Sequence, residues 1–347
     1  MRLRPLTQSG AKQLLPVANK PIIHYVLEDI QSLGVKEVGV VVGAETSVGI
    51  RKELDDGSQW NFNITYIHQE NPLGLAHCVI IAEEFLGDDQ FVMYLGDNLL
   101  EGGIKPFASN FTNGSSNAQV NLVKLPNLKD LGVAEFHEDG HLKRLVEKPE
   151  VPPSDWALTG IYFFDSSIIK AAHSIEPSSR NELEITDAIQ WLLDNGFTVD
   201  HQKIHGWWKD TGQPDDLLEA NTLVLSNLTG KIDPTATVDA DSKLIGEVEV
   251  GPNVQIFNSV VEGPTIIGPG VVIQSSFIGA STSLGSGCLV KNSEVSCSII
   301  MEKAQILEVP VAIHRSLIGR EAVVYRGGEN LEALNLILGD VSRVGLV

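Results

Sequence analysis

The sequence predicts two domains: a Rossmann-like α/β domain with a doubly wound, mostly parallel sheet, and after it a parallel β-helix. Through about residue 228, segments with helical periodicity alternate with short apolar runs, the order expected of βαβ units. From residue 229 onward, apolar residues recur every six positions between glycines and prolines, which is typical of stacked short strands. Because 347 residues can fill two cores, we predict domains at 1–228 and 229–347.

Local patterns give the elements of the first domain. Apolar residues at helical spacing between Pro21 and Gly34 predict a helix that begins near the proline and ends near the glycine. The segment 74–85 predicts a second helix. Apolar runs predict strands at 38–42, 64–68 and 91–95, the first and third buried on both faces.

Two later segments can also be assigned. The runs 133–136 and 142–146 flank Asp139-Gly140, a dipeptide that favours a two-residue hairpin turn, so a β-hairpin is predicted there. A helix that begins at Gln213-Pro214 and runs to Leu225 is expected to join the two domains.

The hexads of the second domain predict which side chains fill its core. Each apolar residue of a hexad should stack on the residue three hexads earlier. The predicted inward positions are Val238, Leu244, Val250 and Ile256, and, after a slip of four residues, Ile266, Val272, Ile278, Leu284 and Val290.

Composition excludes several classes of function. The chain has 25 Lys and Arg against 45 Asp and Glu, a net charge of −20, which argues against a nucleic-acid polymer as partner. No stretch approaches the roughly 18 consecutive apolar residues of a membrane span, and the N-terminus lacks the apolar region of a secretory signal. The three cysteines (Cys78, Cys288 and Cys297) have no metal-ligand spacing, so we expect reduced thiols in a cytoplasmic protein.

Seven short motifs occur in order between residues 2 and 212. They are RLRPLT at 2–7 with KQLLP at 12–16, QENPLGLA at 69–76, LGDN at 95–98, EKP at 147–149, TGIYFF at 159–164, RNELEITD at 180–187 and WWKDTG at 207–212. Each is common alone, but this set in this order resembles the sugar-phosphate nucleotidylyltransferases. With the hexad tail included, nearly the whole chain is similar to the long-form glucose-1-phosphate thymidylyltransferases of that family.

The resemblance implies a nucleotide site. It assigns Arg2 to the α-phosphate and the departing pyrophosphate, and Lys12 to the nucleotide phosphates. Gln69 and Gly74 would face the nucleobase, where a glutamine amide can offer one donor and one acceptor to a pyrimidine. Without the resemblance, the Gln69 segment reads as an ordinary loop before a helix.

The resemblance also implies a metal site for Mg²⁺. It pairs Asp97 of LGDN with Asp210 of WWKDTG as the metal ligands. Two carboxylates leave Mg²⁺ several positions for phosphate oxygens and water. For an isolated Gly-Asp, capping of the following helix would be the simpler interpretation.

The sugar 1-phosphate site is implied by four residues: Gly132, Glu147, Lys148 and Gly160. Glu147 would bind sugar hydroxyls and Lys148 the sugar phosphate, while both glycines would let the sugar approach the backbone. Leu131 stands where short-form relatives carry an aromatic residue, so contacts there are expected from the backbone of Gly132. In RNELEITD, Thr186 and Asp187 are alternative helix caps.

Together these assignments predict transfer of a nucleotidyl group from dTTP to glucose 1-phosphate, with small-molecule substrates and a homo-oligomeric assembly. Three alternatives stay open: a UTP-dependent uridylyltransferase, a catalytically silent nucleotide-binding homologue, and a bifunctional enzyme whose tail uses His314 as an acyl-transfer base. The tail carries no other recognisable chemistry, so removing it after about residue 230 is expected to leave nucleotide binding intact.

In the family, a short strand and a glycine-rich phosphate loop precede the first motif, and this sequence begins at that motif. We therefore expect that the native protein starts some ten or more residues upstream. The chain as given is expected to be a poor enzyme, because that loop donates backbone N–H groups to the triphosphate.

Overall fold

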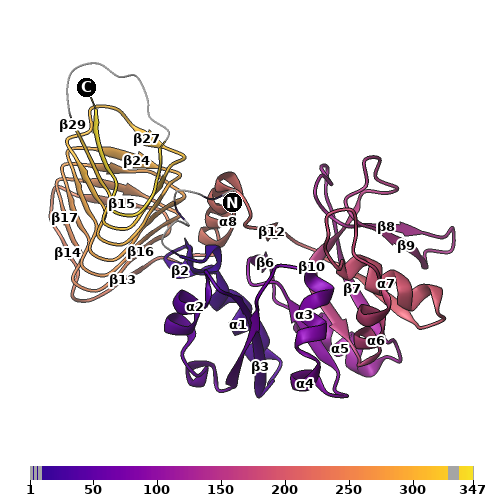
Figure 1. The fold of residues 1–347 in the computed structure, drawn as a ribbon. Helices are drawn as coiled ribbons and strands as arrows, with labels where there is room; N and C mark the ends of the chain where they lie inside the picture. Colours follow the sequence, from indigo (N-terminus) through magenta and orange to yellow (C-terminus); the bar gives the residue numbers. More distant parts are fainter. Residues whose placement is uncertain (1–2, 4–5, 7–9, 327–335, 347) are drawn as a thin grey trace. The chain divides into compact units, whose positions relative to one another are not determined.

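The structure is a computed structural model that describes all of residues 1–347 except 1–2, 4–5, 7–9, 327–335 and 347. The chain forms two compact units (Figure 1). One is built from 1–22 together with 211–347, and the other from 23–210. We call them the discontinuous unit and the α/β unit. The predicted domain boundary at 228/229 lies in the link between the helix that ends at Leu225 and the first strand of the β-helix, which starts at Lys231.

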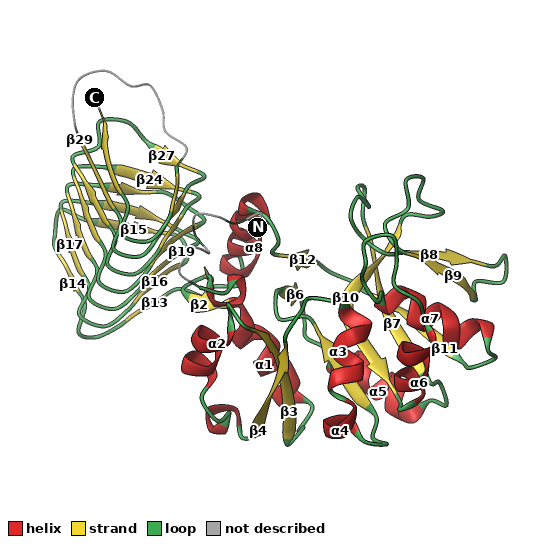
Figure 2. Ribbon diagram, viewed as in Figure 1, coloured by secondary structure: helices red, strands yellow, loops and turns green. Residues whose placement is uncertain are grey.

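The α/β unit alternates helices and strands through most of its length (Figure 2). Its helices are α1 (Ile22–Ser32, which starts at the unit boundary), α2 (Ser47–Leu54), α3 (Leu75–Ile81), α4 (Glu83–Leu86), α5 (Lys105–Asn113), α6 (Ser167–Ser174) and α7 (Ile185–Asp194), with a 3₁₀ turn at Ser58–Trp60. Its strands are β3 (Glu37–Gly43), β4 (Asn63–Gln69), β5 (Phe91–Tyr94), β6 (Asn98–Leu100), β7 (Ala118–Lys124), β8 (Val133–Phe136), β9 (Leu142–Val146), β10 (Trp156–Phe164), β11 (Val199–Lys203) and β12 (Trp208–Asp210).

The main sheet of this unit is centred on β10. Its strand order is β11-β7-β10-β8-β9, and β5 also pairs with β10. Strand β10 runs antiparallel to β5, β7 and β8, whereas β11 is parallel to β7, as is β4 to β3 in a separate pair. The α/β fold class is confirmed, but the sheet is mixed and not mostly parallel. The chain between β7 and β10 returns through the β8–β9 hairpin instead of a crossover helix, which makes the pairing antiparallel.

The core of the α/β unit lies between this sheet and three helices. Helices α3, α6 and α7 contribute Val79, Ile168 and Ile189, which are buried against residues of β7 and β10 such as Leu122 and Phe164. Burying these side chains supplies the main stabilisation of the unit, roughly 1.5–3 kcal/mol for each. This packing fixes the position of β10, which carries Gly160, one of the predicted site residues.

Strands β3 and β5 are less buried than predicted. In β3 only Val38 and Val42 are buried, and every residue of β5 is half-buried. Among the described residues, β3 pairs with β4 alone and β5 with β10 alone, so each strand has one edge without a ladder partner. The apolar runs therefore predicted the strands but not their burial.

The predicted hairpin is confirmed at β8 and β9, with a larger turn than expected. His137 donates its N–H to the carbonyl of His141 at 2.9 Å, so the loop is longer than two residues. Gly140 has φ +87°, which a residue with a side chain rarely adopts. Helix α1 begins directly after Pro21 and ends near Gly34, as predicted.

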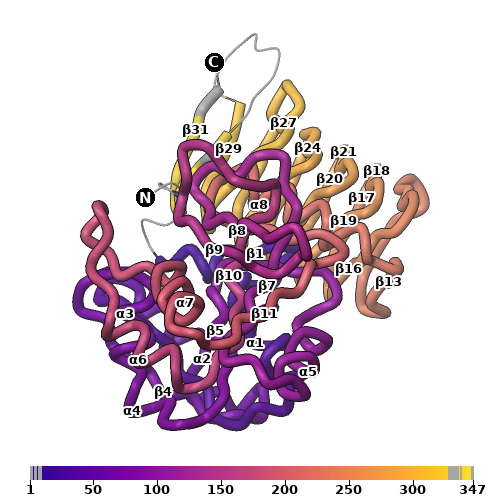
Figure 3. Tube along the Cα trace, turned by 90° about the vertical axis from the view of Figure 1, so that its right-hand side faces the viewer, coloured from indigo at the N-terminus to yellow at the C-terminus, as the bar shows by residue number. Residues whose placement is uncertain are grey.

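The discontinuous unit contains a left-handed parallel β-helix with three faces, which confirms the second part of the predicted fold class (Figure 3). The first face is β13 (Lys231–Ile232), β16 (Val248–Val250), β19 (Thr265–Ile267), β22 (Thr282–Leu284), β25 (Ile299–Ile300), β28 (Leu317–Ile318) and β30 (Ile337–Leu338). The second is β14 (Thr237–Val238), β17 (Gln255–Phe257), β20 (Val272–Gln274), β23 (Leu289–Lys291), β26 (Gln305–Leu307), β29 (Val323–Arg326) and β31 (Arg343–Leu346). The third is β15 (Lys243–Ile245), β18 (Val260–Glu262), β21 (Phe277–Ile278), β24 (Glu294–Ser296) and β27 (Ile313–His314).

The core register of the β-helix differs from the prediction at two positions. Val250 stacks on Ile267, and Ile256 stacks on Ile273. Ile267 and Ile273 therefore point inward, instead of the predicted Ile266 and Val272. Both pairs are 17 residues apart, one fewer than three full hexads. The following turns keep this 17-residue length, as in the pairs Ile267 with Leu284 and Ile278 with Val295, so one interval in each of these turns is five residues instead of six.

One corner of the β-helix is held by a ladder of buried serines. The N–H of Ser276 donates to Oγ of Ser259, and the N–H of Ser293 donates to Oγ of Ser276, at 3.1 and 3.2 Å. Each hydroxyl donates in turn to the carbonyl two residues before it. The ladder satisfies backbone groups at a corner where no strand pairs them.

The rest of the discontinuous unit comes from both ends of the chain. Helix α8 (Pro214–Leu225) begins where the N–H of Gln213 donates to Oδ2 of Asp216 at 2.9 Å. From the N-terminal segment come a 3₁₀ turn at Lys12–Leu14 and the antiparallel pair β1 (Pro16–Val17) and β2 (Lys20–Pro21). No helix among the described residues is long and apolar enough to cross a membrane.

Candidate functional site

The side chain of Asn98 links three segments of the α/β unit. Asn98 is 2% exposed, and its Oδ1 accepts from the backbone N–H of Gly160 at 3.0 Å and from Nε1 of Trp208 at 2.9 Å. It thereby joins the LGDN segment after β5 to β10 and β12. A second link, from the N–H of Leu95 to the carbonyl of Gly160 at 2.8 Å, fixes the same segment on β10.

The two predicted metal ligands lie beside this link, Asp97 just before β6 and Asp210 at the end of β12. Strands β6 and β12 pair antiparallel with Asp210 opposite Asn98, and Asp97 directly precedes Asn98. Nδ2 of Asn98 donates to Oδ1 of Asp97 at 3.2 Å. Asp97 is 7% exposed, a depth at which a carboxylate is stable only with partners or a cation.

The donor set of this pair fits Mg²⁺. Across the described part of the chain, no group of three or more His, Cys, Asp or Glu side chains is arranged to hold a metal. Two carboxylates are what Mg²⁺ commonly takes from a protein when substrate phosphates supply further ligands. Asp97 and Asp210 are therefore the residues that could hold such an ion.

Gly160 lies at an irregularity of β10. The pairing of β10 with β7 shifts register between Leu158 and Tyr162, so Gly160 lies outside the regular ladder. A Cβ at this position would be 2.6 Å from Cδ1 of Leu95 and 2.8 Å from Oδ1 of Asn98. The structure thus shows why position 160 requires glycine, which the sequence did not suggest: a side chain there would prevent the LGDN segment from approaching β10.

Glu147 is the centre of a second cluster. Its Oε1 accepts from Nη2 of Arg180 at 3.0 Å and lies 3.5 Å from Nζ of Lys148. Its Oε2 accepts a hydrogen bond from Oγ1 of Thr186. A Cβ on Gly132 would be 3.3 Å from Oε2. The structure therefore brings together Gly132, Glu147 and Lys148, the three residues predicted for the sugar phosphate besides Gly160.

Arg180 and Thr186 belong to this cluster, and neither was assigned to the site from the sequence. Thr186 lies inside α7 and not at its cap, because the residue before the helix is Glu184. The buried Glu184 accepts from Nη2 of Arg180 at 2.7 Å. Burial, with the nearby carboxylates of Glu184 and Glu147, raises the pKa of Asp187. The cluster thus holds one arginine among several acids.

Gln69 and Gly74, the two residues predicted for the nucleobase site, lie at the two ends of the segment that joins β4 to α3. Nε2 of Gln69 is 3.0 Å from Nδ1 of His77 and also donates to the carbonyl of Gly74 at 3.4 Å. Gly74 has φ +102°, and a Cβ there would be 2.3 Å from the carbonyl oxygen of Leu183. The loop geometry therefore requires glycine independently of any ligand.

The two residues predicted for the phosphates lie in the N-terminal segment. Lys12 begins the 3₁₀ turn Lys12–Leu14, which belongs to the discontinuous unit. Arg2 lies outside the described residues. The remaining predicted site residues all belong to the α/β unit.

Comparison with known proteins identifies the family. The family model for nucleotidyl transferases matches residues 1–227. A glucose-1-phosphate thymidylyltransferase of Streptomyces griseus is 46% identical over 342 residues, covering 99% of this chain and 95% of the relative. The chain belongs to the sugar-phosphate nucleotidylyltransferase family.

Two further relatives of this nucleotidylyltransferase agree with the family. A glucose-1-phosphate thymidylyltransferase of Streptomyces antibioticus is 45% identical over 344 residues, covering 99% of this chain and 96% of the relative. Among solved structures, a candidate glucose-1-phosphate thymidylyltransferase from Bacillus anthracis in complex with sucrose superposes with a TM-score of 0.61 at 33% identity. It covers 66% of this chain and 93% of its own.

The seven motifs therefore identified the family correctly. The residues that sequence reasoning left out (Asn98, Arg180, Thr186 and Trp208) all lie inside those motifs. The spacing of the motifs along the sequence did not indicate which of their residues contact one another.

Proposed function

We propose that this nucleotidylyltransferase transfers a thymidylyl group from dTTP to glucose 1-phosphate, giving dTDP-glucose and pyrophosphate. The observation that carries the proposal is the near full-length similarity to two thymidylyltransferases that act on glucose 1-phosphate by name. The two side-chain clusters support it. One has the carboxylates that a phosphate-bound cation needs, and the other has a carboxylate and two basic groups suited to a sugar phosphate.

The reaction needs alignment more than acid–base chemistry. A phosphate oxygen of glucose 1-phosphate attacks the α-phosphorus of dTTP, a new P–O bond forms, and the α–β phosphoanhydride bond breaks to release pyrophosphate. Because the nucleophile is already an anion, no general base is required. Positioning and charge neutralisation then supply the rate enhancement.

Each cluster has a proposed part in that alignment. Lys12 and Arg2 bind the nucleotide phosphates, and Gln69 with Gly74 receives the base. Asp97 and Asp210 would hold Mg²⁺, which supplies positive charge to the phosphate oxygens when bound.

In the sugar cluster, Glu147 accepts from sugar hydroxyls while Arg180 and Thr186 keep its carboxylate oriented. The ammonium of Lys148 is 3.5 Å from Glu147, so a sugar bound to the carboxylate would place its phosphate within reach of Lys148 and Arg180. Gly132 and Gly160 stay proposed sugar-site residues.

We further propose that the enzyme acts in the cytoplasm as a homo-oligomer. All three cysteines are free, which suits a reducing compartment. An oligomer would be assembled through the β-helix, whose described strands carry none of the residues proposed for nucleotidyl transfer.

The test is pyrophosphate release with dTTP or UTP and a panel of sugar 1-phosphates. We expect glucose 1-phosphate to be preferred and dTTP to exceed UTP in kcat/KM by about 10–200-fold, since one methyl group in an apolar pocket gives about that discrimination. A preference for UTP would instead support the uridylyltransferase alternative. Binding of dTTP without turnover, under all conditions with Mg²⁺, would support the silent homologue.

Two variants make the same test residue-specific. Asp97→Asn is expected to abolish Mg²⁺-dependent turnover while the protein stays folded. Arg180→Met should raise KM for glucose 1-phosphate about 10-fold or more and leave KM for dTTP nearly unchanged, because its guanidinium contacts Glu147 of the sugar cluster. An equal rise in both KM values would contradict a specific role for Arg180 in binding glucose 1-phosphate.

A further inference from the structure

The segment that carries Lys12 is bound to the β-helix through two asparagines. After the 3₁₀ turn at Lys12–Leu14, β1 and β2 form a tight turn whose tip is Ala18-Asn19. Both tip residues have left-handed φ values, 47° and 62°. For alanine this backbone conformation is unfavourable, so contacts outside the turn must hold it.

The first contact is made by Asn221 of α8. Asn221 is 0% exposed, and its Oδ1 accepts from the N–H of Ala18 at 2.8 Å. The same oxygen accepts from the hydroxyl of Ser283, and Nδ2 donates to the carbonyl of Ser281 at 3.1 Å. A single buried side chain therefore ties together the N-terminal turn, α8 and the β22 turn of the β-helix.

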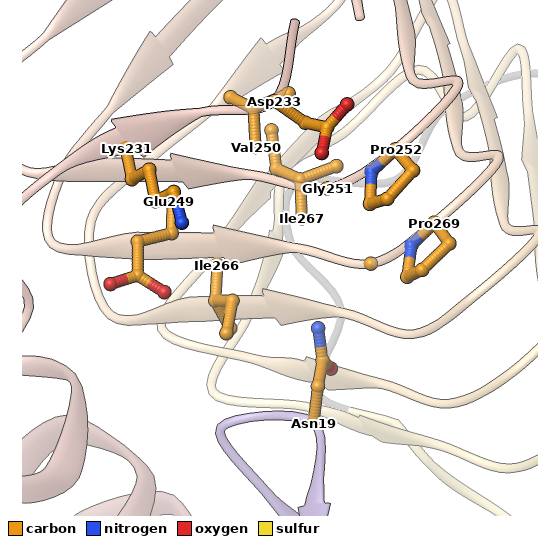
Figure 4. A pocket seen from close by; sticks show the side chains of 11 residues that line it. Asn19, Lys231, Asp233, Glu249, Val250, Gly251, Pro252, Ile266, Ile267 and Pro269 are labelled. Carbon is orange, nitrogen blue, oxygen red and sulfur yellow. The ribbon is translucent and has the colours of Figure 1, made fainter. Parts of the chain in front are cut away.

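The second contact is made by Asn19 itself. Its Nδ2 donates to the carbonyl of Leu284, the last residue of β22, at 2.8 Å. Figure 4 shows Asn19 reaching from its turn toward the strands of the β-helix, beside a groove of about 280 Å³ lined by Ile266 and Pro269 among others. Both asparagines thus attach the turn to the same strand.

The attachment continues to Lys12 through the backbone. The N–H of Ile22 donates to the carbonyl of Leu15 at 3.1 Å, and the N–H of Leu15 donates to the carbonyl of Lys12 at 3.0 Å. Short hydrogen-bonded steps therefore connect the turn held by Asn221 to the backbone of Lys12. A flexible lysine gains most for binding when its backbone is already fixed.

We infer that Asn221 is a positioning residue for nucleotide binding, and that the β-helix sets the place of Lys12. The inference rests on the proposed function, which assigns Lys12 to the nucleotide phosphates. It replaces the expectation that the β-helix can be removed without effect on nucleotide binding.

The test compares three full-length variants with the wild type. Asn221→Ala removes all the contacts of that side chain, and Asn19→Gly removes one amide while keeping the left-handed φ accessible. Ser276→Ala, in the serine ladder, is the matched control because it disturbs the β-helix without touching the turn. For each variant we would measure Tm, KM for dTTP and for glucose 1-phosphate, Kd for dTTP, and hydrogen exchange of amides 12–21.

Asn221→Ala is expected to raise KM and Kd for dTTP by about 10–100-fold, the value of one charge-assisted contact. KM for glucose 1-phosphate should change less than twofold, and amides 12–21 should lose protection. Asn19→Gly should shift the dTTP constants in the same direction by a smaller factor. Ser276→Ala should lower Tm and leave the dTTP constants unchanged.

Unchanged dTTP constants in Asn221→Ala would overturn the inference, whatever happens to Tm, as would an equal shift in Ser276→Ala. If the wild type binds dTTP but transfers nothing, the proposed function fails and Kd still decides the role of Asn221. Absence of dTTP binding by the wild type would overturn both.

Discussion

Replacing Asn98 with alanine should affect both the stability of the α/β unit and its metal site. The variant leaves the N–H of Gly160 and Nε1 of Trp208 without their acceptor in a site where Asn98 is 2% exposed. Each of the two buried donors left unpaired costs about 1–3 kcal/mol, so the expected loss is about 2–6 kcal/mol. Against a total stability of about 5–15 kcal/mol, the unit should stay folded at 25 °C with a lowered midpoint.

Fluorescence offers a selective assay for this loss. All five tryptophans of the chain lie between residues 60 and 208, inside the α/β unit. Urea unfolding followed by tryptophan emission therefore reports this unit and not the β-helix. Because Asn98 also contacts Asp97 and anchors the strand that bears Asp210, the Mg²⁺ concentration for half-maximal pyrophosphate release should rise about 10-fold or more in the folded variant.

Asn121→Ala is the matched control. Asn121 is 1% exposed and donates to the carbonyl of Ile161 at 3.0 Å, while its Oδ1 has no hydrogen-bond partner among the described residues. Replacing Asn121 leaves one buried carbonyl, that of Ile161, without its donor. The expected loss of stability is about 1–3 kcal/mol, with no change in Mg²⁺ dependence. If Asn98→Ala costs under 1 kcal/mol, or if both variants shift the Mg²⁺ dependence equally, the role given to Asn98 is wrong.

Two further predictions concern a glycine and the thiols. Gly74→Ala should destabilise the α/β unit by about 1–3 kcal/mol in urea unfolding, because its Cβ would meet the carbonyl oxygen of Leu183 at 2.3 Å and φ is +102°; a neutral effect would mean that the loop moves freely. Burial raises the pKa of Cys78 to about 11 and of Cys288 to about 12, so iodoacetamide at pH 8 should label Cys297 first by mass spectrometry. Because the thiolate is the reactive form, labelling of Cys78 should rise about tenfold per pH unit above pH 8, and a flat profile would contradict the buried thiol.

Local patterns predicted the elements well because they depend on neighbours in sequence. The hairpin strands β8 and β9 match the predicted bounds, since alternating side chains and a turn define them locally. The one-residue shift at Ile267 could not be seen, because a 17-residue turn is specified by how successive turns stack. The mixed sheet also escaped prediction, since strand direction depends on which partner β10 finds.

The site was predicted as a set of motifs but not as contacts. Glu147 meets Thr186 across 39 residues, and Asn98 meets Trp208 across 110, so neither pair has a local signal. Gly160 was predicted to let a sugar approach the backbone, and the structure adds a second requirement for glycine, because the LGDN segment packs against its Cα. Tertiary packing decides which polar residue of a motif becomes a link between strands.

The discontinuous unit has a consequence for how the chain matures on the ribosome. Ala18 is separated from its partner Asn221 by 203 residues, and Asn19 from Leu284 by 265. The partners of the N-terminal turn are therefore synthesised long after the turn itself. At about 5–20 residues per second, that wait lasts on the order of 10–50 s. Leu15 and Val17, buried in the finished protein, stay uncovered for this time. A nascent chain with these apolar residues uncovered is a natural client for chaperones that bind early, and lower growth temperatures should favour its soluble yield.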